Sequence, residues 1–179
     1  MYPEIDADAY VSETAIIIGD VHIGSQSSIW FNVVVRGDVN SIRIGRRTNI
    51  QDLSILHVTG IKDDGRPGFP LSIGDNVTVG HKATLHGCRV ENSAFIGMNA
   101  MIMDGVVVGE GAMVAAGSVV TEQTVIPPWT LWMGCPAKLK RILSAEEKMR
   151  SLELAESYVK LSKTYIADST GRAADIFTE

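Results

Sequence analysis

The chain of 179 residues contains four histidines, and three of them, His57, His81 and His86, fall inside one sequence repeat. Imidazole nitrogens are common ligands of zinc and of other transition metals. Three neutral imidazoles on one ion leave a coordination position open for water or substrate, as in catalytic rather than structural zinc sites. These residues predict a metal centre if the fold brings them to one ion.

The repeat that holds the histidines is a run of aliphatic residues spaced by six. A period of six fits neither a 3.6-residue helix nor a long alternating strand, but it fits a short strand followed by a turn. Three such units close one triangular coil of eighteen residues. The sequence therefore predicts a mainly β fold, a left-handed parallel β-helix of hexapeptide repeats. The repeat aliphatics are Ile23, Ile29, Val35, Ile44, Ile50, Leu56, Ile73, Val79, Leu85, Val90, Ile96, Ile102, Val108, Val114 and Val120.

The chain is expected to divide into a β-helix domain with flanking segments, 1–143, and a C-terminal segment, 144–179. Because Pro127-Pro128 cannot donate ladder hydrogen bonds, the repeat is expected to end near Val120.

A C-terminal α-helix is expected to begin at Ser144-Ala145-Glu146-Glu147, which has the form of a capping box. Its apolar or semi-polar stripe should pack along the outside of the β-helix, and the tail from Ala167 should be loose. The stripe is Leu152, Ala155, Tyr158, Val159, Ser162 and Tyr165.

Composition excludes several classes of partner. Sixteen basic and 21 acidic residues give a net charge of −5 without a basic run, so nucleic acid is not expected to bind. No apolar stretch reaches membrane-spanning length, and Met1-Tyr2-Pro3-Glu4 lacks the features of a signal peptide. Two cysteines, Cys88 and Cys135, are too few for a disulfide framework, so a cytoplasmic location is expected.

The spacing of the repeat predicts which residues stack. The step from Val35 to Ile44 is nine and that from Leu56 to Ile73 is seventeen, so residues one coil apart differ by eighteen plus any such insertion. By this rule Arg36, His57 and His86, each directly after a repeat aliphatic, stack in one column. Adjacent coils lie about 4.8 Å apart. Two imidazoles at that spacing can bind one zinc ion at Zn–N distances of about 2.1 Å.

His81 falls on the preceding face of the same coil, with Asp52 stacked beneath it. Five residues separate it from His86 by up to about 16 Å, so one copy of the chain cannot readily complete the site. A second copy can, in a three-fold ring that sets Arg36, His57 and His86 against Gln51, Asp52 and His81 of the next chain. We therefore predict a homotrimer with three shared metal sites. The alternative, that outward histidines are ordinary surface residues, is our interpretation of His22.

The segments Arg36-Gly37-Asp38 and Asn49-Ile50-Gln51-Asp52, with His57 and His81-x4-His86-Gly87, resemble the γ-class carbonic anhydrases. The likeness covers almost the whole chain, up to Gly134-Cys135-Pro136-Ala137-Lys138. It implies a trimer whose zinc or iron is held by two histidines of one subunit and one of the next. It also implies reversible hydration of carbon dioxide to bicarbonate, since zinc lowers the pKa of bound water to about 7 and so provides a nucleophile. Cobalt(II) would suit three imidazoles as well.

Further residues are given roles on this basis. Gln51 is expected to orient the reacting water, with Asn49 near the reactants or, alternatively, satisfying a turn. Arg36, Asp38 and Asp52 are expected to be structural interface residues, with Arg36 paired to a carboxylate across the interface. A direct catalytic role of Arg36 in binding bicarbonate is the alternative.

The chain departs from active archaeal-type members at two places. Val39 replaces a glutamate, and Val58-Thr59-Gly60 follows His57 where an acidic loop would carry a proton-shuttle glutamate. We therefore expect low or cryptic activity. Two other functions remain open: a hexapeptide acyltransferase or acyl-CoA thioesterase, which would need no metal triad, and a non-enzymatic metal- or siderophore-binding protein.

Overall fold

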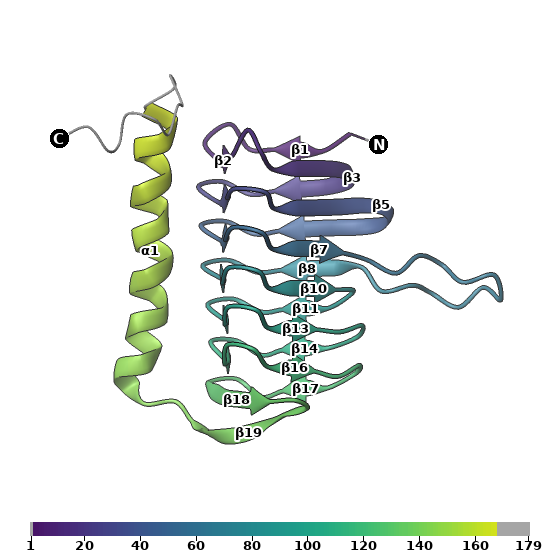
Figure 1. The fold of residues 1–179 in the computed structure, drawn as a ribbon, viewed down its shortest axis with the longest axis vertical. Coiled ribbons are helices and arrows are strands. Elements are labelled where there is room, and N and C mark those ends of the chain that lie inside the picture. Colours follow the sequence, from purple (N-terminus) through teal and green to yellow (C-terminus); the bar gives the residue numbers. More distant parts are fainter. Residues whose placement is uncertain (1, 168–179) are drawn as a thin grey trace.

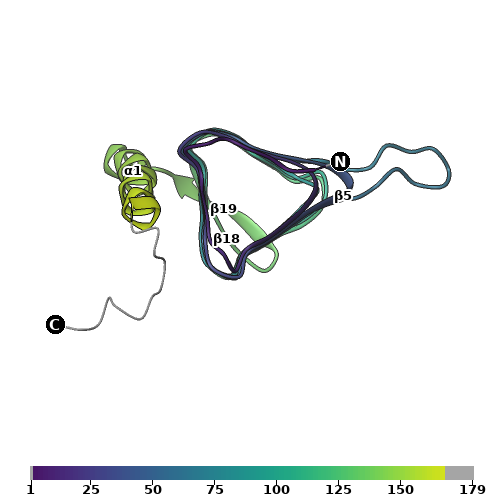
Figure 2. The ribbon, with the colours of Figure 1, turned by 90° about the horizontal axis from the view of Figure 1, so that it is seen from above.

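The computed structural model describes residues 2–167, which form a parallel β-helix of triangular cross-section with one α-helix standing beside it (Figures 1 and 2). The helix face of the prism consists of β2 (Tyr10–Val11), β4 (Ser28–Ile29), β6 (Asn49–Ile50), β9 (Thr78–Val79), β12 (Phe95–Ile96), β15 (Met113–Val114) and β18 (Thr130–Gly134). The histidine face consists of the first parts of β3 (Ile16–Ile23) and β5 (Val34–Ile44), then β7 (Ile55–His57), β10 (Thr84–His86), β13 (Met101–Ile102) and β16 (Val119–Val120). The third face consists of β1 (Glu4–Ile5), the ends of β3 and β5, β8 (Leu71–Ile73), β11 (Arg89–Val90), β14 (Val107–Val108) and β17 (Val125–Ile126). The predicted fold class is confirmed.

The repeat aliphatics build the core of the prism. All fifteen have at most 2% of their surface exposed, and the small residues that precede them by two positions, such as Ser27, Ala83 and Ala94, are also buried. After twelve of the fifteen repeat aliphatics, the third residue takes a left-handed backbone conformation, for example Asn32 (φ 56°) and Asn99 (φ 57°). Asparagine or glycine, which tolerate this conformation better than other residues, occupies six of these corner positions.

The predicted end of the β-helix near Val120 is wrong. β17 continues the third face by pairing in parallel with β14, and β18 pairs in parallel with β15. Gly109, one coil before Pro127, donates its N–H to the Ile126 carbonyl of the next coil at 2.9 Å. Pro127 lies in the last coil of the described residues, where a missing donor costs nothing. The chain then folds back as β19 (Ala137–Ile142), which is antiparallel to β18.

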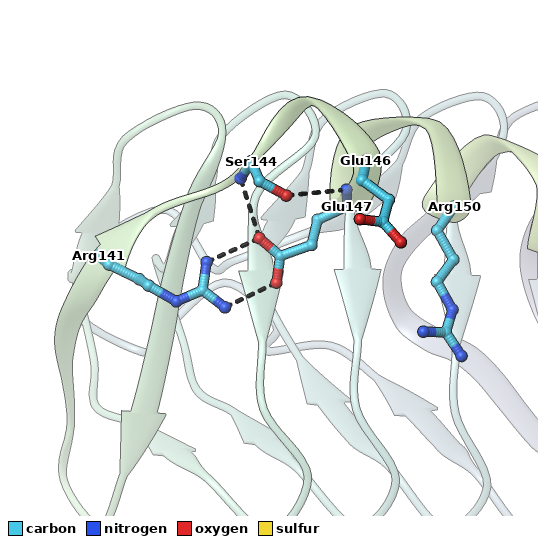
Figure 3. A pocket seen from close by; sticks show the side chains of 5 residues that line it. All are labelled: Arg141, Ser144, Glu146, Glu147 and Arg150. Carbon is cyan, nitrogen blue, oxygen red and sulfur yellow. Dashed lines mark hydrogen bonds and ion pairs between the residues drawn. The ribbon is translucent and has the colours of Figure 1, made fainter.

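The C-terminal helix α1 (Ala145–Ala167) begins with the predicted capping box. The N–H of Glu147 donates to Ser144 Oγ at 3.2 Å, and the N–H of Ser144 donates to the Glu147 carboxylate at 2.9 Å (Figure 3). Arg141 adds two hydrogen bonds to that carboxylate, at 2.7 and 2.6 Å. Together these donors lower the pKa of Glu147 to about 2. The start of α1 is therefore held by an ionised carboxylate.

Helix α1 packs on the helix face, as predicted, where it contacts β2, β4, β6 and β9. The stripe of α1 residues that faces the β-helix differs from the predicted stripe at one position. Leu152 is 44% exposed, and Ser151 is buried instead. Most side chains in this stripe are small, which lets the helix backbone approach the strands closely. The buried residues of α1 are Ser151, Ala155, Val159 and Ser162.

Aromatic residues anchor α1 near the start of the β-helix. Tyr165 packs against Tyr10, Trp30 and Phe31, with ring centroids 5.2–6.0 Å apart, and Tyr158 packs edge-on against Trp30. The tail expected to be loose lies outside the described residues beyond Ala167. Within residues 2–167, no helix has the length and apolar character needed to cross a membrane.

Candidate metal centre

His57 and His86 lie side by side on the histidine face. They are direct partners in the parallel register of β7 and β10, as the spacing predicts. Nδ1 of His57 lies 3.1 Å from Nε2 of His86. Two nitrogens bound to one tetrahedral zinc ion at about 2.1 Å would lie about 3.4 Å apart. The pair therefore fits a shared metal ion with only a small adjustment.

Arg36 and Asp38 lie in β5, the coil before β7. Val35 pairs with Leu56, so Arg36 falls in the same column as His57, as predicted. Arg36 Nη1 donates to Asp38 Oδ2 at 2.6 Å, and Asp38 Oδ1 lies 3.2 Å from His57 Nε2. The Arg36 guanidinium holds the pKa of the Asp38 carboxyl below its usual range. Arg36 thus has a carboxylate partner within its own chain, and its pairing with a carboxylate across an interface stays a prediction.

His81 lies at the opposite edge of the histidine face, in the corner that follows β9. Its Nδ1 is 2.6 Å from Asp52 Oδ2, which confirms the predicted stacking of these two residues. Asp52 therefore contacts a candidate ligand directly, beyond the structural role expected of it. Within residues 2–167 of one chain, no three histidine, cysteine, aspartate or glutamate side chains form a metal-binding cluster. That a second copy supplies the third ligand stays a prediction.

Asp104 is a site residue that the sequence reasoning missed. Its Oδ1 lies 2.6 Å from His86 Nδ1, and its Oδ2 accepts a hydrogen bond from Thr59 Oγ1 at 2.6 Å. The register of β10 and β13 pairs Leu85 with Ile102, a coil of seventeen residues, so counting places Met103 rather than Asp104 beside His86 and gives no signal for this contact. With this residue, each of the three histidines has a carboxylate partner on one ring nitrogen and keeps the other nitrogen for a ligand. Carboxylate partners of this kind are typical of metal-binding histidines.

Gln51 and Asn49 lie beside Asp52, on the part of the helix face that α1 covers. Asn49 is 1% exposed and Gln51 is 5% exposed. Gln51 Nε2 donates to Asn49 Oδ1 at 3.0 Å, and Asn49 Nδ2 donates to Thr78 Oγ1 at 2.9 Å. The polar atoms of Asn49 are therefore engaged inside the protein. Its contacts favour a role in holding the Gln51 amide over contact with a reactant.

Comparison with known proteins gives the family. A family model described as dynactin subunit 5 matches residues 1–165. The mitochondrial γ carbonic anhydrase 2 of Arabidopsis thaliana is 48% identical over 168 residues, 94% of this chain and 60% of the plant protein. A carbonic anhydrase of Geobacillus kaustophilus is 46% identical over 92% of this chain and 87% of its own length. A solved structure from Bacillus cereus, of a protein provisionally named an acetyltransferase, has a TM-score of 0.86 at 43% identity and covers 91% of each chain.

Fold and site define a hexapeptide-repeat β-helix protein with paired histidines on one face of the prism. Within that class, its relatives place the chain in the γ-class carbonic anhydrase-like family. It spans about 60% of the length of the Arabidopsis relative.

Proposed function

We propose that this protein is a metal-dependent carbonic anhydrase that hydrates carbon dioxide reversibly to bicarbonate. The observation that carries the proposal is the convergence of His57 Nδ1 and His86 Nε2 to 3.1 Å, with the other nitrogen of each ring facing a carboxylate. Relatives that carry the name carbonic anhydrase support it. Zinc is the proposed metal, and Fe²⁺ or Co²⁺ would suit the same imidazoles.

The third ligand in this proposal is His81 of a neighbouring copy in a homotrimer. An apolar column on the histidine face supports such an assembly, because it runs between the corner of His81 and the edge with His57 and His86. Strand register aligns its members, and Ile16, Ile55 and Met101 are 53%, 48% and 43% exposed. The column consists of five apolar residues and one threonine, Ile16, Val34, Ile55, Thr84, Met101 and Val119. Burying exposed apolar surface of this kind stabilises association.

Within the proposed site, zinc would act as a Lewis acid that lowers the pKa of bound water to about 7. Gln51, held by Asn49, would orient the reacting water by a hydrogen bond from its amide group. Asp38 and Asp52 would hold the imidazoles of His57 and His81 in the tautomer that leaves one nitrogen bare. Arg36 would keep Asp38 ionised, and its remaining donors would attract bicarbonate.

Slow turnover is part of the proposal. Val39 is 54% exposed and Val58 is buried, and neither can carry a proton away from the site. The acidic residues of the following loop, Asp63 and Asp64, are exposed, and Asp64 pairs with Arg66 at 2.7 Å. We also propose a cytoplasmic location, which suits the two free thiols of Cys88 and Cys135.

The experiment is to purify the protein without chelator, measure metal per chain, and assay carbon dioxide hydration beside acyl-CoA hydrolysis. We expect about one metal per chain and hydration that Gln51→Ala lowers by ten-fold or more. His22→Ala is the matched control, since His22 lies away from the site and pairs only loosely with Asp6, at 4.0 Å. Bound metal without hydration would contradict the proposal.

A second function is favoured by one observation, the resemblance to the Bacillus cereus structure named for acetyl transfer. Acyl-CoA hydrolysis or acyl transfer that persists after metal removal would support that function. Metal binding without either reaction would favour a metal- or siderophore-binding protein.

A further inference from the structure

Asp104 and Thr59 join the candidate metal centre to the long loop between β7 and β8. This loop leaves the prism at the corner away from α1 (Figure 2). Its two ends are tied together by the backbone of Thr59 and Phe69, which exchange hydrogen bonds of 3.0 and 2.9 Å. Asn40 Nδ2 also donates to the Thr59 carbonyl at 3.0 Å. The base of the loop is therefore fixed, and the Thr59 hydroxyl points from it to Asp104.

Asp104 is held on both sides. One carboxylate oxygen faces His86 Nδ1 and the other accepts from Thr59, both at 2.6 Å. Gly87 permits this approach. A Cβ atom there would lie 2.4 Å from Asp104 Oδ1 and 2.6 Å from Phe69 Cβ, and its φ is +50°. The Asp104 side chain is only 20% exposed, so its hydrogen bonds are partly shielded from water.

We propose that Asp104 is a positioning residue that keeps His86 in the Nδ1–H tautomer, with Nε2 bare and aimed at His57 Nδ1. Thr59 orients the carboxylate, so the base of the loop sets the geometry of a metal ligand. The inference rests on the proposed metal site. Loss of the carboxylate partner of a ligating histidine typically costs 10–100-fold in metal affinity.

Asp75 offers a matched control elsewhere on the prism. It also lies at a coil corner, where its Oδ1 accepts from the Arg46 N–H at 2.7 Å. That oxygen lies 2.4 Å from the position of a Cβ on Gly45, as Asp104 does from Gly87. Asp75→Ala therefore removes a corner carboxylate of the same kind without touching a histidine.

The first measurement is the dissociation constant of Zn²⁺, by competition with a chelator, on folded protein. Asp104→Ala is expected to weaken binding about 10–100-fold. Thr59→Val should weaken Zn²⁺ binding less than Asp104→Ala does. Thr59→Ser keeps the hydroxyl, so it should bind Zn²⁺ as tightly as the unmodified chain, and so should Asp75→Ala. Equal affinities of Asp104→Ala and the unmodified chain would overturn the inference, as would an equal loss in Asp75→Ala.

The second measurement needs no metal. Nitrogen-15 NMR of the metal-free protein, at a pH where the rings are neutral, reports the tautomer of His86. We expect Nδ1–H in the unmodified chain and a shift toward Nε2–H in Asp104→Ala. An Nε2–H tautomer in the unmodified chain would overturn the inference whatever the metal content. Weaker metal binding by Asp104→Ala in a protein without carbon dioxide hydration would support the inference and contradict only the proposed function.

Discussion

Two complementary variants test whether the metal site is shared between copies of the chain. One variant carries His81→Ala, and the other carries His57→Ala with His86→Ala. Within one chain, His57 and His86 converge to 3.1 Å while His81 lies at another corner of the prism. In a closed ring, each site would combine the histidine pair of one copy with His81 of the next. Neither variant alone can form an intact site.

Mixed trimers give the magnitude. With equal amounts of the two variants and random assembly, half of the copies keep both His57 and His86. Half of the copies that follow them in the ring keep His81. About one quarter of the sites are then complete, or ~0.25 metal ions per chain, against about none for either parent.

The assay is co-expression or joint refolding of the two variants, followed by gel filtration and elemental analysis of the trimer fraction. His22→Ala mixed with the unmodified chain controls for handling and should keep about one metal per chain. Full metal content in the His81→Ala trimer would refute the shared site. Mixed trimers with no more metal than their parents would refute it equally.

Three further predictions follow from the structure. Ile55→Glu places a charge in the exposed apolar column of the histidine face. We expect this variant to sediment as a monomer rather than a trimer in sedimentation velocity. An unchanged sedimenting mass would contradict that interface. Ile96→Ala empties a fully buried position and should lower the free energy of unfolding by about 2–5 kcal/mol in urea titration, while Met98→Ala, at an exposed position, should change it by less than about 0.5 kcal/mol. The pKa of Glu147 is lowered in the folded chain, so its contribution is present above its usual pKa of 4.5 and is lost as pH falls toward about 2. The midpoint temperature of thermal unfolding should therefore be lower for Glu147→Gln than for the unmodified chain at pH 6, and the two temperatures should converge near pH 2. A difference between them that does not change with pH would argue against this ion pair.

The six-residue spacing by itself determined the fold and two of the residue pairings at the candidate site. It did so because strand register in a β-helix repeats coil after coil, so a count of residues places His57 beside His86 and Asp52 beside His81. The capping box at Ser144 was predictable for a similar reason, since its hydrogen bonds span only three residues.

The tertiary structure decided what lies against these elements. Counting along the chain does not reveal that α1 buries Asn49, because the path of the helix across the prism depends on close approach of small side chains such as Ser151 and Ala155. That the β-helix continues to Pro127 depends on backbone N–H groups of the preceding coil, such as that of Gly109, which donate to carbonyl groups of the last coil. The Thr59–Asp104–His86 contact depends on side-chain direction at a corner where a long loop returns. Periodicity fixes where backbones lie, whereas the partners of polar side chains are chosen by packing between distant segments.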